Sequence, residues 1–163
     1  MSQVTLHTNK GDILIELHAD RCPQTVSHFL ALCEAGFYDG SIFHRVVPNF
    51  VIQAGGYKSG MVKLSATAPI ANESASAMSN TRGTVAMARL QAADSATTQF
   101  FINLADNSNL DYRDNQAAGY CVFGEVIEGM EVVDAIAAVD TGRRGMLIDV
   151  PVEDVIIEGV DVG

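Results

Sequence analysis

Tryptophan is absent from this chain of 163 residues, and cysteine and histidine are scarce. Cys22, Cys33 and Cys121 show no C-x-x-C spacing, and the four histidines show no spacing typical of metal ligands. A zinc site is therefore not expected. Three cysteines with no pairing pattern are typical of free, partly buried thiols in a reducing compartment. We expect no metal and no other cofactor.

Basic residues are half as numerous as acidic ones, 10 against 20, and the net charge is −10. Such a surface repels phosphate backbones and anionic lipids, so neither nucleic acid nor a membrane is an expected partner. No apolar run approaches the roughly 20 residues of a membrane helix, and the N-terminal segment has no apolar core of a secretory signal. We expect a cytoplasmic protein with one domain spanning residues 1–163.

The N-terminal part of the chain predicts a β-hairpin followed by a helix. Apolar and polar residues alternate along residues 4–17 on both sides of a turn at 9–11, which is typical of a hairpin. Pro23 and Gly36 enclose a stretch with apolar residues at helical spacing, and they suit the first turn and the end of a helix. His28 lies beside that apolar face, where we expect it to be solvated.

The rest of the chain predicts short strands, a second helix and three loops. The loops at 57–82, 91–97 and 105–119 are rich in small and polar residues, and long loops inside a compact domain are usually functional or mobile. Helical spacing at 130–137 ends at 141–142. About eight short strands and two well-separated helices favour an antiparallel barrel or sandwich with helices covering its open ends. Strand-forming stretches are found at 43–47, 50–56, 83–89, 98–104, 120–124, 148–152 and 155–160.

One permanent cation, Arg45, lies in the otherwise mostly apolar segment FHRVVPNFVIQAGG of residues 43–56. We expect two short strands joined at Pro48, with Arg45, Phe50 and Gln53 on one face. An arginine in an apolar strand costs free energy unless it is paired or borders a cleft. Its fixed N–H donors suit it to holding a carbonyl or polarising an amide. A structural arginine in a surface ion pair explains the segment equally well.

Four segments taken in order, FHRVVPNFVIQAGG, GTVAMA, TTQFFI and YCVFGEVIEGMEVVDAI, resemble the cyclophilin family of peptidyl-prolyl cis–trans isomerases. The resemblance extends from about residue 4 to 160 and is greatest to the bacterial cytoplasmic B-type branch. It implies a mainly β fold, a closed eight-stranded antiparallel barrel capped by two helices. It also implies a monomer that accelerates rotation about X–Pro bonds in peptides and in unfolded or nascent proteins, assists their folding and needs no cofactor.

The resemblance assigns the catalytic arginine to Arg45, with His44 beside it. The residues that it places around the substrate are His44, Phe50, Gln53, Met87, Ala88, Arg89, Gln99, Phe101, Leu110 and Tyr120. Among these, the proline pocket consists of Phe50, Met87, Phe101 and Leu110. The glutamines are polar contacts, and the backbone at Ala88 and Arg89 pairs with the substrate. Phe100 should face the barrel interior, because neighbouring strand residues point to opposite faces.

The chain departs from the family at three positions that border the expected cleft. Tyr120 stands where many members carry histidine, and Arg89 replaces a common asparagine. Asn109 stands where animal cytosolic members carry a tryptophan that contacts cyclosporin, a cyclic peptide bound by many members. An asparagine lacks the apolar area of an indole, so the resemblance implies weak cyclosporin binding.

Two other function classes compete with an isomerase. A binding module or chaperone could hold proline-containing segments in the same pocket without catalysis, and only Arg45 argues for rate acceleration. A hydrolase is disfavoured, because the sequence contains no G-x-S-x-G segment and no serine in an activating context. The apolar residues of the proposed pocket could also belong simply to the core.

Overall fold

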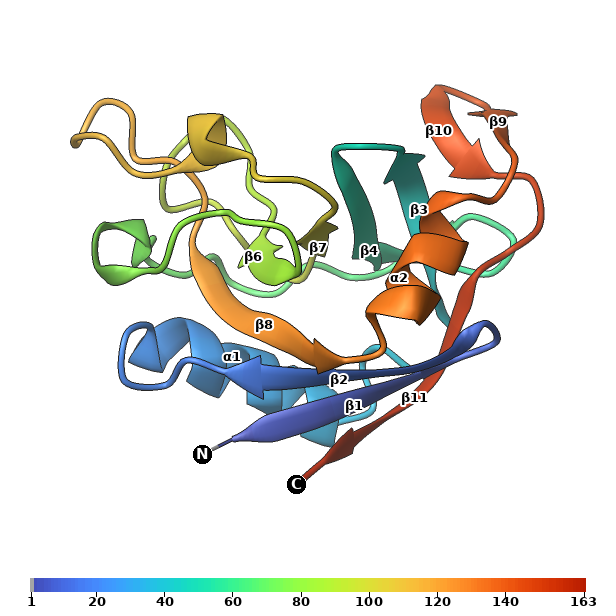
Figure 1. Cartoon of the computed structure of the whole chain (residues 1–163), viewed down its shortest axis with the longest axis horizontal. Coiled ribbons are helices and arrows are strands. Elements are labelled where there is room, and N and C mark those ends of the chain that lie inside the picture. Colours follow the sequence, from blue (N-terminus) through green and yellow to red (C-terminus); the bar gives the residue numbers. More distant parts are fainter. Residues whose placement is uncertain (1) are drawn as a thin grey trace.

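The structure is a computed structural model that describes residues 2–163, and its centre is a closed antiparallel β-barrel (Figure 1). Eight strands follow one another around it in the order β3-β11-β1-β2-β8-β6-β7-β4, and the pairing of β3 with β4 closes the ring. The expected eight-stranded barrel is thus confirmed. These strands are β1 Gln3–Thr8, β2 Gly11–Leu17, β3 Ser41–Val47, β4 Val51–Lys58, β6 Thr84–Met87, β7 Phe100–Asn103, β8 Val122–Glu128 and β11 Ile156–Val162.

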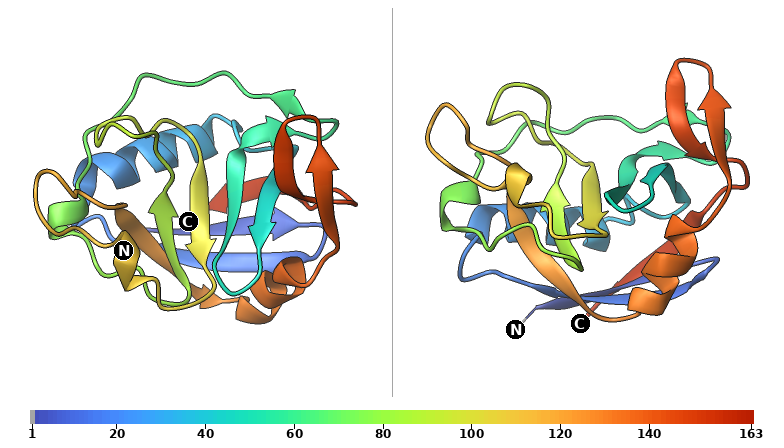
Figure 2. Two further views of the ribbon diagram at one scale, coloured as in Figure 1. Left: turned by 90° about the horizontal axis from the view of Figure 1, so that it is seen from above. Right: turned by 45° about the horizontal axis from the view of Figure 1, so that its top comes forward.

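Three further short strands lie outside the barrel. β5 (Val62–Lys63) adds two residues to the edge of β4. β9 (Thr141–Arg144) and β10 (Leu147–Pro151) form a separate two-stranded ribbon that extends beyond the barrel (Figure 2). The helical pattern was expected to end at 141–142, but the helix ends at Ala137 and residue 141 begins β9.

The two helices lie on opposite sides of the barrel (Figure 2). α1 (Pro23–Glu34) begins with its proline in the first turn, and Gly36 follows it with φ +72°, as the sequence predicts. α2 (Met130–Ala137) buries Val133 and Ile136. Two short 3₁₀ turns, η1 (Ser74–Ser76) and η2 (Ser108–Leu110), lie in the long loops. Among residues 2–163, no helix combines the length and apolarity that a membrane crossing requires.

Aromatic side chains fill the barrel interior beneath α1. The ring of Phe29 lies 5.4 Å from that of Phe100 and 4.9 Å from that of Phe123, between centroids. Tyr38 packs edge-on against Phe100 and donates its hydroxyl proton to the Thr98 carbonyl oxygen at 2.7 Å. A buried Tyr hydroxyl needs such an acceptor. The cluster is therefore apolar, and the Tyr38 hydroxyl within it is hydrogen-bonded.

The expectation that His28 is solvated is wrong. Its side chain is half-buried, and its Nε2 lies 2.6 Å from the carbonyl oxygen of Thr97. A ring nitrogen at that distance donates a hydrogen bond to the carbonyl. His28 therefore ties α1 to the 91–97 loop, which spacing along a helix could not reveal.

Candidate active site

A tight turn joins β3 to β4 and places the first residue of the site. The N–H of Phe50 donates to the Val47 carbonyl at 3.0 Å, and Asn49 has φ +65°. Proline at the second turn position and a left-handed residue at the third are the requirements of a type II turn. Pro48 and Asn49 meet them, so the expected interruption at Pro48 is a hairpin turn, with Phe50 at its exit.

A β-bulge in β3 aims Arg45 outward. Phe43 pairs with Ala54 and Arg45 pairs with Gln53, so β3 advances two residues where β4 advances one. Without a bulge, Phe43 and Arg45 would point to the same face. In the structure, Phe43 is fully buried in the main core, whereas Arg45 is half-buried and borders a cleft. Bulges commonly re-aim a side chain in this way beside functional sites.

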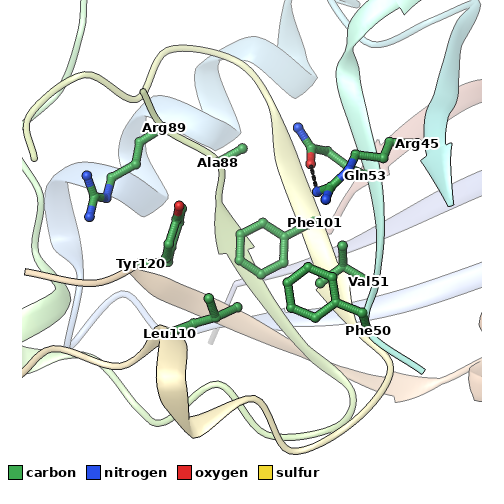
Figure 3. Close-up of a pocket in the computed structure, with 9 residues that line it drawn as sticks. All are labelled: Arg45, Phe50, Val51, Gln53, Ala88, Arg89, Phe101, Leu110 and Tyr120. Carbon is green, nitrogen blue, oxygen red and sulfur yellow. Dashed lines mark hydrogen bonds between the residues drawn. The ribbon is translucent and has the colours of Figure 1, made fainter. Parts of the chain in front are cut away.

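The cleft has a volume of about 300 Å³ and is formed by segments that lie far apart in the sequence (Figure 3). The turn and strands at 45–53 form one side, and the end of β6 and the segment entering β8 form the other. Its lining residues are Arg45, Phe50, Val51, Gln53, Ala88, Arg89, Phe101, Leu110 and Tyr120.

Polar groups on one side of the cleft form a short chain of hydrogen bonds. Arg45 donates from Nη1 to Gln53 Oε1 at 3.2 Å, and Gln53 donates from Nε2 to Gln99 Oε1 at 2.8 Å. The guanidinium carbon of Arg45 also lies 5.8 Å from the centre of the Phe50 ring. Within residues 2–163, no carboxylate lies within ion-pair distance of Arg45, so the surface ion pair considered for it is not formed.

Phe101 forms the apolar floor of the cleft. It is 4% exposed and belongs to a small cluster with Val51 and Ala86, apart from the main core. The Tyr120 ring meets it edge-on at 5.7 Å. Phe100, its neighbour, is fully buried in the main core. The expected division of the two phenylalanines between cleft and interior is therefore found.

Met87 does not line the cleft, contrary to the expectation for the proline pocket. Its side chain is 2% exposed, packs in the main core and borders a separate small cavity beside Cys121. Val51 borders the cleft instead. Side chains along a strand alternate between its two faces, so Val51 lies on the same face of β4 as Gln53, two residues later. This alternation could have identified Val51 from the sequence.

His44 and Gln99 also stand apart from the lining residues. His44 is buried, and its ring centre lies 4.9 Å from that of Tyr57. Burial, aided by the charge of Arg45, lowers the pKa of His44 to about 4, so the imidazole is neutral near pH 7. Gln99 reaches the cleft only through its bond to Gln53. The remaining eight expected site residues lie together in the cleft.

The described residues offer no alternative centre of metal chemistry. Within 2–163, no group of three or more His, Cys, Asp and Glu side chains is placed to hold a metal ion. All three cysteines are free and buried, as the sequence predicts. The polar side chains that line the cleft are those of Arg45, Arg89, Gln53 and Tyr120, beside an apolar floor.

Comparisons with known proteins agree over nearly the whole chain. The family model described as cyclophilin type peptidyl-prolyl cis-trans isomerase/CLD matches residues 3–162. Peptidyl-prolyl cis-trans isomerase B of Escherichia coli (strain K12) is 55% identical over 161 residues, which cover 98% of each chain. A peptidyl-prolyl cis-trans isomerase of Streptomyces antibioticus is 47% identical over 99% of both chains. The crystal structure of a cyclophilin type isomerase of Cryptosporidium parvum has a TM-score of 0.80, covering 99% of this chain and 97% of that one at 24% identity, a likeness of fold.

Proposed function

This chain belongs to the cyclophilin family of peptidyl-prolyl cis–trans isomerases, and we propose that Arg45 is the residue with which it acts on the X–Pro amide. It is a prolyl isomerase that takes proline-containing peptides as substrates. The observation that supports Arg45 is its position. Its guanidinium borders the cleft, held by Gln53 and beside Phe50, and has no carboxylate partner within residues 2–163.

Rotation about a peptide bond is slow because resonance sets a barrier of about 18–20 kcal/mol. No bond is made or broken, so the enzyme has only to bind the twisted amide better than either planar form. As the amide twists, the lone pair of the prolyl nitrogen becomes localised and can accept a hydrogen bond. Arg45 donates that bond, which opposes resonance, and it remains charged at any working pH. Each 1.36 kcal/mol gained in this way is tenfold in rate.

The apolar floor holds the prolyl ring while the preceding group turns. Phe101, Val51 and Leu110 border the cleft beside Arg45, and an apolar ring placed on them is removed from water. The backbone N–H of Arg89 donates to no other group in the described part of the chain. It is therefore available to the substrate backbone, as the resemblance implied for Arg89, whereas the N–H of Ala88 already donates to the Gln99 carbonyl at 3.0 Å.

We expect Arg45→Ala to lose most of the isomerase rate, at least tenfold, and to keep the fold, because the side chain is not part of the core. Arg45→Lys should also be slow, since a point charge lacks the planar donor fork. NMR exchange on an X–Pro peptide measures the rate, and circular dichroism reports the fold. Near-normal exchange in Arg45→Ala would show that Arg45 is not the catalytic residue, and unfolding would make the residue structural.

We also propose that cyclosporin binds weakly to this protein. Asn109 is exposed in η2, next to Leu110, and does not line the cleft. An indole there would add a large apolar face and one N–H donor. Asn109→Trp should therefore tighten cyclosporin inhibition much more than it changes turnover. Equally tight inhibition of wild type and variant, in a titration against the exchange rate, would show that the position does not control binding.

We further propose that the protein acts as a cytoplasmic monomer with a single domain over residues 1–163. Three free, buried thiols fit a reducing compartment. The net charge of −10 opposes self-association. Sedimentation velocity at working concentration tests the monomer directly, and unfolded or nascent chains are its expected clients.

A further inference from the structure

We propose that the cleft prefers peptides with an acidic residue flanking the proline, and that Arg89 is the residue that recognises the carboxylate. This inference rests on the proposed function, because it concerns the substrate of the same cleft. Arg89 is half-buried and borders the cleft on the side away from Arg45 (Figure 3). The two arginines therefore bracket the place of the prolyl ring.

The cleft is cationic although the protein as a whole is strongly acidic. Its lining includes two arginines and no carboxylate, and within residues 2–163 neither arginine forms an ion pair. The acidic side chains of the neighbouring loops have other partners. Asp94 accepts a hydrogen bond from the N–H of Asn72, and Asp111 accepts bonds from Asn80 and from a serine next to it.

Arg89 is held in position before any ligand binds. Its Nε donates to the Gly119 carbonyl at 2.8 Å, and its Nη1 donates to the carbonyls of Leu90 and Gln91 at 3.1 and 3.0 Å. Its guanidinium carbon lies 4.8 Å from the centre of the Tyr120 ring. These bonds use neutral acceptors, so the positive charge stays uncompensated. Nη2 donates to no group within residues 2–163 and is available to a ligand.

A residue next to the proline is within reach of this guanidinium. The Tyr120 ring separates the cleft floor from Arg89, 5.7 Å from the Phe101 ring and 4.8 Å from the Arg89 guanidinium. An extended chain advances about 3.3–3.6 Å per residue. A glutamate immediately before or after a proline seated on Phe101 can therefore place its carboxylate beside Nη2.

Local attraction outweighs the repulsion from the acidic surface at ordinary salt. The Debye length is about 8 Å at 0.15 M ionic strength, so distant carboxylates are screened while a charge in contact is not. Because Arg89 is already immobilised, an ion pair with it costs little side-chain entropy on the protein side. The ordinary cost of ordering two long side chains is one reason why exposed pairs contribute little.

The test compares peptides that differ only by glutamate or glutamine, placed either immediately before or immediately after the proline. For each protein, kcat/KM is measured by NMR exchange, and the ratio of glutamate to glutamine peptide is taken within that protein. A general loss of activity in a variant then cancels. We expect a ratio of about three to five in wild type at one of the two positions, as for a favourable exposed ion pair.

Three variants separate charge from structure. Arg89→Gln should bring the ratio close to one, and Arg89→Lys should keep most of it. Arg143→Gln removes the same charge from an exposed position on the β9–β10 ribbon and should leave the ratio as in wild type. Salt at about 1 M, where the Debye length is about 3 Å, should also lower the wild-type ratio.

A wild-type ratio of one at both positions, or a raised ratio that survives in Arg89→Gln, would overturn the inference. Equal loss of the ratio in Arg143→Gln would assign the effect to overall charge and overturn it as well. Isomerisation of the glutamine peptide reports separately on the proposed function. If wild type fails to isomerise that peptide, the isomerase mechanism is wrong, whatever the ratio.

Discussion

Adjacent residues on one strand of this protein contribute to different properties. Phe100 is fully buried between Phe29 and Tyr38, whereas Phe101 meets Tyr120 at the edge of the cleft. Both are phenylalanines of β7, and both are nearly inaccessible to solvent. They differ in their surroundings, because Phe100 is enclosed by the main core whereas Phe101 borders the cleft.

We expect Phe100→Ala to lower the free energy of unfolding by about 3–5 kcal/mol, since it opens a cavity among aromatic rings that cannot collapse. Phe101→Ala should cost less stability, because the vacated space opens to the cleft, and should weaken peptide binding more. Urea denaturation and an NMR peptide titration of both variants provide the comparison. If Phe101→Ala were the less stable of the two and bound peptide normally, the assignment of the two faces would be wrong.

His44 should make stability depend on pH. Its folded-state pKa of about 4 lies below the ordinary value of 6.5. Between these values the unfolded chain binds a proton that the folded chain does not, so stability falls as pH decreases through this range. The difference corresponds to a loss of up to about 3 kcal/mol, complete near pH 4. Above pH 6.5 both states are neutral and His44 has no effect.

The measurement is the free energy of unfolding in urea from pH 7 to pH 4, compared between wild type and His44→Gln. The comparison is needed because other groups titrate over the same range, among them His7, whose pKa is raised by its bonds to Asp161 and Asp12. The variant should show a flatter decrease. Parallel curves would mean that the buried imidazole accepts a proton as readily as in the unfolded chain.

At the level of secondary structure elements, the long loop after β4 caps a helix. Cys22, the residue before α1, makes no side-chain cap. Instead, Glu73 accepts hydrogen bonds from the N–H of Gln24 at 3.3 Å and of Thr25 at 2.7 Å, and from the Thr25 hydroxyl at 2.7 Å. A carboxylate at a helix N-terminus satisfies free N–H groups and opposes the positive end of the helix dipole. The loop therefore has a structural role that its composition did not indicate.

We expect Glu73→Ala to lower the free energy of unfolding by about 1–2 kcal/mol, the range for loss of an N-terminal cap. Glu34→Ala is the matched control. It removes an exposed carboxylate from the other end of α1, where negative charge is unfavourable, and should change stability by less than about 0.5 kcal/mol. Equal losses in the two variants, measured by urea denaturation, would show that Glu73 does not act as a cap.

On the scale of the whole molecule, closure of the barrel creates the site. β4 pairs with β7, and β7 pairs with β6, which brings Gln53, Phe101 and Ala88 to one cleft although they lie far apart in the chain. Closure also concentrates positive charge, since a protein of net charge −10 presents two arginines there that form no ion pair with any described residue. Neither property belongs to a single segment.

The sequence by itself determined the parts of this protein that depend on neighbours along the chain. Alternation predicted the β1–β2 hairpin, helical spacing predicted α1 and α2, and Pro48 marked the turn. The strand count favoured an antiparallel barrel or sandwich, the resemblance to the family implied the closed barrel, and an isolated cation in an apolar segment pointed to Arg45.

Only the tertiary structure decided which side chains face the cleft. The bulge that separates Phe43 from Arg45 exists because β3 pairs with β4 in a shifted register. Strict alternation along β3 alone would place the two residues together. Met87 lies in the core and Val51 in the cleft, because a residue's face depends on how its strand joins the barrel. The bonds of His28 to Thr97, of Arg89 to Gly119 and of Glu73 to the start of α1 each join residues far apart in the chain. No local pattern encodes such contacts, so only the folded structure shows them.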